Sequence, residues 1–231
     1  MTDVLGILQD MGELFAHRIA EDFSLRVQID LQPDGDSWQV VVESGCRVTV
    51  SPGPDQRAQV ILVTTEEILE KIHTGQMTAL TAAAKSTMSD AAPLDYRLGK
   101  EQSFTPQLYA DMLVFLQRFF NCTEPERILL GEAHSRTVHG ARVVGLFYQS
   151  GFRSAWYLVK KGDRLNEPGD TNPFPQAFVF VSGDGWAKIG EKTLPVRAGE
   201  AYLVPPGNEH IVWTEGDEPL TLLWLAWGEG A

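Results

Sequence analysis

The stretch from Gly199 to His210 constrains the fold of this 231-residue chain more than any other segment. It reads Gly-Glu-Ala-Tyr-Leu-Val-Pro-Pro-Gly-Asn-Glu-His, so a short apolar run enters a Pro-Pro-Gly turn and a histidine follows at once. Apolar runs that stop at such turns are typical of strands. The segment therefore predicts a strand, a tight turn, and the imidazole of His210 at the start of the next strand.

From Ala141 onward the sequence predicts strands only. Short apolar runs alternate with turns rich in glycine and proline, a spacing typical of a β-sandwich or barrel. The expected strands lie at 143–148, 155–159, 177–181, 186–189, 201–204, 211–214 and 220–227.

The spacing of Gly199, Pro205, Gly207 and His210 resembles the second motif of the cupin superfamily. The resemblance implies an all-β jelly-roll barrel over residues 141–231, with His210 pointing into its mouth. It also implies a homodimer, because cupins commonly pair through edge strands.

The first cupin motif usually supplies two histidines and a glutamate. Here the loop that opens at Gly162 and closes at Gly183 contains no histidine, and Gln176 stands where the resemblance places the glutamate. A catalytic metal site usually needs at least three protein ligands. The sequence therefore predicts that no cofactor is bound.

Two alternatives keep chemistry at this site. Oxygen donors in the loop, Glu167, Asp170 and Asn172, could join His210 and Gln176 around a divalent metal. Glu167 could instead act as a general base beside His210, which would make these two the catalytic residues. Carboxylates in such loops more often cap turns.

Aromatic residues flank the predicted mouth. Phe178 and Trp213 are candidates for ligand binding there, together with Gln176. The same aromatic residues could equally pack the core or form a dimer interface.

Residues 1–121 predict an α+β domain, a sheet with helices on one face. Helices are expected at 3–20, at 78–85, at 107–120 after the cap Thr105, and after the capping box Thr64-Thr-Glu-Glu67, ending at Gly75. Antiparallel strands are expected at 25–31, 38–42, 48–50, 58–63 and 93–98.

This element order resembles the sterol carrier protein type-2 domain. The matching features are the turn Asp34-Gly35, Trp38 at the start of a strand, Gly45, the run 58–63 and the segment from Thr64 to Thr78. The resemblance implies a pocket for a lipid, sterol or acyl chain between sheet and helices. The candidate lining residues are Phe15, Trp38, Val40, Leu62, Leu69, Ile72, Met77, Met112, Phe115 and Phe119. The same apolar spacing is also that of a closed core.

Composition narrows the partners and the location. The net charge of −12 argues against nucleic acid and anionic membrane surfaces as partners. The N-terminus does not read as a signal peptide, and no apolar run approaches the roughly 20 residues of a membrane span. Cys46 and Cys122 have no spacing typical of a metal or redox pair. The sequence predicts a cytoplasmic protein without membrane insertion.

The leading hypothesis is a binding protein with a domain at 1–121, a linker at 122–140 and a barrel at 141–231. The first domain would hold an amphipathic or apolar small molecule. The barrel would bind a polar head group, a second ligand or another subunit without metal. The alternative is a cupin enzyme, of isomerase or oxygenase type, that uses His210 with Glu167 or Asp170. A third possibility is a purely structural protein whose barrel serves dimerisation.

Overall fold

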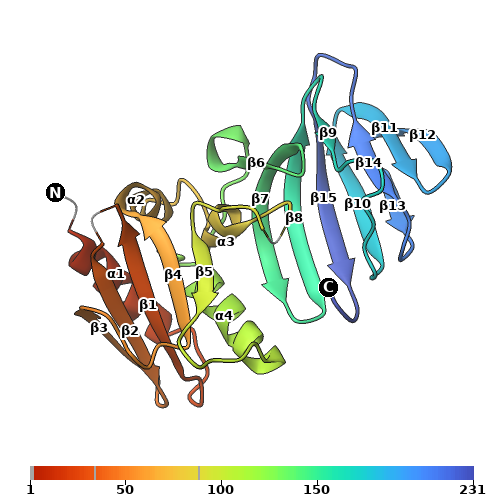
Figure 1. The fold of residues 1–231 in the computed structure, drawn as a ribbon. Helices are drawn as coiled ribbons and strands as arrows, with labels where there is room; N and C mark the ends of the chain where they lie inside the picture. Colours follow the sequence, from red (N-terminus) through yellow and green to blue (C-terminus); the bar gives the residue numbers. More distant parts are fainter. Residues whose placement is uncertain (1–2, 34, 88) are drawn as a thin grey trace. The chain divides into compact units, whose positions relative to one another are not determined.

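The computed structural model describes residues 3–33, 35–87 and 89–231, which form two compact units (Figure 1). Unit 1 contains the chain up to Ala83 and Ala91–Leu129, and unit 2 contains Ala84–Asp90 and Leu130–Ala231. The segment Ala84–Asp90 was expected within the first domain. It joins unit 2 instead, where Ala84 packs against the hydrophobic core.

Unit 1 is a five-stranded sheet with helices. Its elements are α1 (Val4–Ala16), β1 (Leu25–Gln32), β2 (Ser37–Glu43), β3 (Arg47–Pro52), β4 (Val60–Thr65), α2 (Glu66–His73), α3 (Ala79–Ala83), β5 (Asp95–Leu98) and α4 (Pro106–Arg118). The strand order is β3-β2-β1-β4-β5. β4 pairs parallel to β1, so the prediction of a fully antiparallel sheet is wrong at this pair. Alternating side chains identify a strand but carry no information about its neighbour's direction.

The two faces of this sheet differ in polarity. Val27 on β1 pairs with Val40 and Val60, and all three are buried. The opposite face of β1 carries Arg26, whose guanidinium pairs with the buried carboxylate of Asp55 at 2.8 Å. The core of unit 1 therefore lies on the face that carries the alternating apolar residues.

Two of the helix caps differ in how well the sequence predicted them. The Thr105 hydroxyl accepts from the Leu108 amide at 3.1 Å, as expected for the start of α4. Thr65, rather than the expected Thr64, caps α2 by accepting from the Ile68 amide at 3.3 Å. Thr64 is still part of β4, and its hydroxyl donates to the carbonyl of Pro93 at 3.0 Å.

Most of the expected lining residues pack together as a core. The ring centroids of Phe15 and Phe115 lie 5.5 Å apart, and those of Phe115 and Phe119 lie 4.4 Å apart. A side chain exposed by 0–2% is almost wholly covered by its neighbours. Eight candidates have this exposure: Phe15, Val40, Leu62, Leu69, Ile72, Met112, Phe115 and Phe119. Trp38 and Met77 are half-buried. The structure therefore assembles no open tunnel around these residues, and the sterol carrier resemblance stays a prediction. Asp34 of its turn lies outside the described residues.

One guanidinium secures the C-terminal end of α4. Arg18 donates to the carbonyl oxygens of Asn121 and of Thr123, the latter at 2.6 Å, and Arg118 returns a 2.6 Å bond to the Arg18 carbonyl. Charged donors contribute about 1.5–3 kcal/mol each, and loss of Arg18 leaves these partly buried carbonyls without their donor.

We therefore expect Arg18→Ala to lower the free energy of unfolding by about 2–4 kcal/mol, because two carbonyls lose a charged donor. Urea unfolding followed by circular dichroism measures the change. Arg127→Ala is the matched control, because Arg127 is exposed. Equal stability of the two variants would contradict this role of Arg18.

Unit 2 is all-β apart from one short 3-10 turn, η1 (Glu132–His134). Its strands are β6 (Arg136–Val138), β7 (Ala141–Gln149), β8 (Phe152–Val159), β9 (Arg164–Leu165), β10 (Gln176–Ser182), β11 (Asp184–Ile189), β12 (Lys192–Arg197), β13 (Ala201–Val204), β14 (His210–Trp213) and β15 (Leu220–Trp227). They form a six-stranded sheet, β13-β10-β15-β8-β7-β6, and a four-stranded sheet, β12-β11-β14-β9.

All seven strands predicted in this half are present, and three more were not predicted. β6 and β9 are very short, and β12 contains Pro195. Residues from both sheets, including Tyr157, Phe178 and Val212, pack into one core. This core fills the space between the sheets, as predicted for a barrel or sandwich.

No helix in the part of the chain that the structure describes is long and apolar enough to cross a membrane.

Candidate functional site

His210 opens β14 and lies at one end of the core of unit 2. The turn Pro205-Pro-Gly-Asn208 precedes it, and positive φ at Gly207 closes that turn. Val212, two residues on, packs in the core, so alternation along the strand points His210 to the same side. The side chain is 2% exposed, and its ring centroid lies 5.9 Å from that of Phe178.

Trp224 fixes the orientation of Gln176. The indole nitrogen of Trp224 lies 2.6 Å from Oε1 of Gln176, which is 1% exposed. An indole N–H only donates, so the glutamine oxygen must face Trp224 and its NH₂ group must face the other way. That NH₂ group lies 3.2 Å from Nε2 and 3.3 Å from Nδ1 of His210, so it packs over the ring between the two nitrogens.

The surrounding hydrogen bonds also fix the protonation of His210. The carbonyl of Asn208, 3.0 Å from Nδ1, only accepts, so Nδ1 carries the ring proton. Nε2 then holds a lone pair, and the amide nitrogens of Gln176 and Asn172 lie 3.2 and 3.3 Å from it. His210 is therefore a neutral imidazole with a partner at each nitrogen. Burial lowers its pKa further below the ordinary value, against the smaller effect of the Asn208 hydrogen bond.

These donors do not fit a divalent metal ion. A metal would need the Nε2 lone pair and an oxygen of Gln176, but the amide nitrogen of Asn172 lies 3.3 Å from the first and Trp224 donates to the second. Within the described residues, no three His, Cys, Asp or Glu side chains are grouped so that they could hold a metal. The predicted oxygen-rich set of His210, Glu167, Asp170 and Gln176 is not assembled.

One of the two loop carboxylates, that of Asp170, stabilises a turn instead. Glu167 and Asp170 are both exposed, and the Asp170 carboxylate accepts from the Glu167 amide at 2.9 Å. None of the ring hydrogen bonds of His210 in the described part of the chain goes to Glu167. The predicted pairing of Glu167 with His210 as base and acid is therefore not formed. An aspartate three residues beyond Glu167 caps this turn, as short carboxylates often do.

Only one of the two predicted aromatic residues, Phe178, lies beside His210. Phe178 lies on β10 beside His210, as expected. Trp213 lies three positions after His210 on the same strand, and so faces the other side of the sheet. There its ring lies 5.0 Å from the guanidinium of Arg164. Trp213 therefore does not line the site.

Sequence reasoning missed Asn166, which holds two backbone segments at this end of the core. Its amide N–H donates to the carbonyl of His139 at 2.8 Å, and its side chain donates to the carbonyl of His210 at 3.0 Å. Asn166 has φ of 65° and His139 has φ of 54°, in the left-handed region that non-glycine residues rarely adopt. Strained residues cluster at functional sites. The sequence feature that could have indicated this contact is His139-Gly140, because such a pair is typical of the two-residue turn that it forms between β6 and β7.

The depressed histidine pKa values predict an acid-sensitive fold. Burial lowers the pKa of both His139 and His210 in the native state. As the pH falls through about 6.5, the unfolded chain therefore gains protons that the native state does not. The free energy of unfolding should fall by about 1.4 kcal/mol per pH unit for each histidine until the native pKa is reached.

Urea unfolding between pH 5.5 and 8 measures this loss of stability, and His210→Gln should show a shallower pH dependence than wild type. Parallel profiles for the two proteins would contradict a neutral, buried His210.

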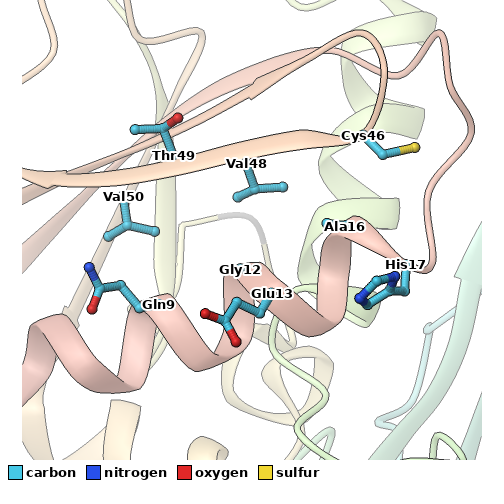
Figure 2. A pocket seen from close by; sticks show the side chains of 9 residues that line it. All are labelled: Gln9, Gly12, Glu13, Ala16, His17, Cys46, Val48, Thr49 and Val50. Atoms are coloured by element: carbon cyan, nitrogen blue, oxygen red, sulfur yellow. The ribbon is translucent and has the colours of Figure 1, made fainter.

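A groove of about 690 Å³ opens in unit 1 between α1 and the edge strand β3 (Figure 2). Val48 and Val50 point from β3 towards α1, whereas Thr49 points away. A Cβ atom at Gly12 would lie only 3.2 Å from Val48, so glycine permits the close approach of helix and strand. The remaining lining residues are Gln9, Glu13, Ala16, His17 and Cys46. The groove is therefore part apolar and part polar, and none of its lining residues was predicted.

Comparisons with known proteins concern the second half of the chain. The cupin domain family matches residues 156–226. A search of curated proteins finds no match. Among solved structures, a cupin 2 conserved barrel domain protein from Salinispora arenicola is 22% identical, covers 45% of this chain and 88% of its own, and has a TM-score of 0.40.

Two further solved structures are less similar in sequence. A protein from Photorhabdus luminescens is 16% identical, with coverage of 44% and 87% and a TM-score of 0.40. A predicted oxalate decarboxylase from Thermotoga maritima is 15% identical, with coverage of 38% and 79% and a TM-score of 0.35. The family match, together with the two antiparallel sheets around one core, identifies residues 156–226 as a cupin domain.

Proposed function

We propose that the cupin domain binds a small organic molecule without a metal ion, at the end of the core that carries His210. The observation that carries this proposal is the 2.6 Å bond from Trp224 to Gln176. Gln176 stands where the cupin resemblance places a metal-binding carboxylate. The bond from Trp224 turns the NH₂ group of Gln176 towards the imidazole of His210. Asn172 is half-buried and adds an amide at the solvent side, so a ligand with carbonyl or carboxylate oxygens would find N–H donors there.

Equilibrium dialysis against Mn²⁺, Fe²⁺ and Zn²⁺, followed by elemental analysis, tests the metal-free part of this proposal. We expect less than about 0.1 metal per chain at micromolar metal, since fewer than three ligands are available. Stoichiometric metal that is lost in His210→Gln would overturn it.

A thermal-shift screen of small carbonyl compounds and organic acids tests the binding part. We expect compounds that raise the melting temperature of wild type and not of Asn172→Ala, whose site lacks one donor. The predicted enzyme alternative has less support, because the Asp170 carboxylate is engaged by the Glu167 amide and no ring hydrogen bond of His210 in the described part of the chain goes to Glu167.

For unit 1 we retain binding of an amphipathic small molecule as a second candidate, moved to the groove between α1 and β3. The observation that favours it is the pairing of apolar Val48 and Val50 with polar Gln9 and Glu13 around one open volume. Displacement of a fluorescent fatty acid tests it. Ala16→Phe, which fills the groove, should abolish binding. Ala20→Phe, at an exposed position that is not among the lining residues, should not.

The homodimer also remains a proposal. Its support is Leu203 on the edge strand β13, which is 72% exposed, and Val181 on the neighbouring β10, which is 53% exposed. Light scattering after size exclusion should give twice the mass of one chain, and Leu203→Asp should give a monomer.

A further inference from the structure

Arg153 is a half-buried cation that lacks a counterion among the described residues. It lies on β8, two residues before Ala155 and four before Tyr157, which both pack in the core of unit 2. Alternation along the strand therefore points Arg153 to the same inner face. Among the residues that the structure describes, no carboxylate forms an ion pair with it. Covering one N–H group of a guanidinium without an acceptor or a counterion is unfavourable, which raises the question of what this N–H group binds.

The hydrogen bonding of this guanidinium is also incomplete. Its Nε atom is buried and has no acceptor within the described part of the chain. Its Nη2 atom donates to the carbonyl of Gly230 at 3.4 Å, which is a long contact. Arginine carries five N–H donors in a planar fork, and the Nε–Nη2 edge matches both oxygens of a carboxylate or phosphate.

The surroundings hold the fork in place without neutralising it. The guanidinium carbon lies 5.8 Å from the ring centroid of Tyr148 and 5.8 Å from that of Phe174. Aromatic rings stabilise a cation but accept no in-plane hydrogen bond, so they leave the Nε–H group without an acceptor. Glu229, on the neighbouring turn, is exposed and does not pair with Arg153 among the described residues.

We propose that Arg153 is an oxyanion-binding residue, which holds a carboxylate or phosphate group of a small molecule between Tyr148 and Phe174. The group would accept from Nε and Nη2 and replace the long contact to Gly230. The net charge of −12 repels anions from the chain as a whole. Such a site would therefore select its ligand through the local geometry of the guanidinium and not through the electrostatic field of the whole protein. The inference goes beyond the His210 site and does not depend on it, because Ala226 stands between Gln176 and Arg153 in the strand register.

Titration with sodium phosphate and with sodium succinate, at ionic strength held constant with chloride, tests the proposal. The readout is the ¹H–¹⁵N signal of the Arg153 Nε–H group, assigned by its absence in Arg153→Lys. We expect a saturable shift of this signal with phosphate, with succinate or with both. The salt that produces the shift shows whether the site binds a phosphate or a carboxylate group.

Binding measured by calorimetry should weaken about tenfold or more in Arg153→Lys, which keeps the charge but loses the fork, and vanish in Arg153→Gln. Arg164→Gln, which removes the cation beside Trp213, is the matched control and should bind like wild type. If neither salt shifts the signal beyond the chloride reference, or if Arg153→Lys binds as well as wild type, Arg153 serves only to pack its two aromatic neighbours.

Discussion

Replacing Gln176 with glutamate is expected to convert His210 from a neutral imidazole into an imidazolium at neutral pH. One carboxylate oxygen would keep the hydrogen bond from Trp224, and the other would face Nε2 of His210 at about the present 3.2 Å. An opposite charge at this distance raises a histidine pKa by about 1–3 units. The pKa of His210 would then lie above that of the unfolded chain.

The pH dependence of stability should change sign as a result. In wild type the native pKa of His210 is depressed, so stability is lost as the pH falls below about 6.5. In Gln176→Glu the contribution of the pair is present at low pH and is lost as the pH rises through the raised native pKa. Urea unfolding from pH 5.5 to 8.5 distinguishes the two profiles.

Gln149→Glu supplies the matched control, because it adds the same charge at the exposed end of β7. If Gln176→Glu keeps the wild-type pH profile, Gln176 and His210 are not coupled as their geometry indicates.

Phe15→Ala should be the most destabilising single change in unit 1, with a loss of about 3–5 kcal/mol in the free energy of unfolding. Phe15 is wholly buried, and its ring makes edge contacts with those of Phe23, Phe115 and Phe119. Its removal leaves a cavity that these rigid neighbours cannot fill.

This variant also decides between a closed core and a lipid tunnel. If ligand normally occupied the space beside Phe15, truncation would enlarge a pocket that already exists and would cost much less. Urea unfolding of delipidated protein provides the measurement, and Phe104→Ala, at a side chain that is 55% exposed, provides the control. A loss below about 1 kcal/mol would favour the tunnel.

The strands of both units could be predicted because their apolar residues alternate. Val27, Ile29 and Leu31 on β1, and Val48 and Val50 on β3, show this period clearly. The direction of pairing could not be predicted, because β1 and β4 meet only after the chain has passed through two other strands. β9 was missed because a pair of residues, Arg164 and Leu165, is too short to show any period.

The site could be predicted only in part. His210 and Gln176 were predicted from the resemblance to the two cupin motifs, and the structure brings them together. Their orientation depends on Trp224, which is 48 residues from Gln176 and reaches it through the pairing of β10 with β15. Asn166 was missed for the same reason, since its partners His139 and His210 come from distant segments. Glu167 and Asp170 were chosen for their chemistry, but the Asp170 carboxylate accepts from the Glu167 backbone amide in a local turn.

The central claim is that His210 is a neutral imidazole held by amides and not a metal ligand. The ¹⁵N signals of its ring, recorded at pH 7 with and without added Zn²⁺, test this claim most directly, with His210→Gln for assignment. We expect the neutral form with the proton on Nδ1 and a lone pair on Nε2, unchanged by zinc. A protonated ring at pH 7, or an Nε2 signal that moves stoichiometrically with zinc, would contradict the account.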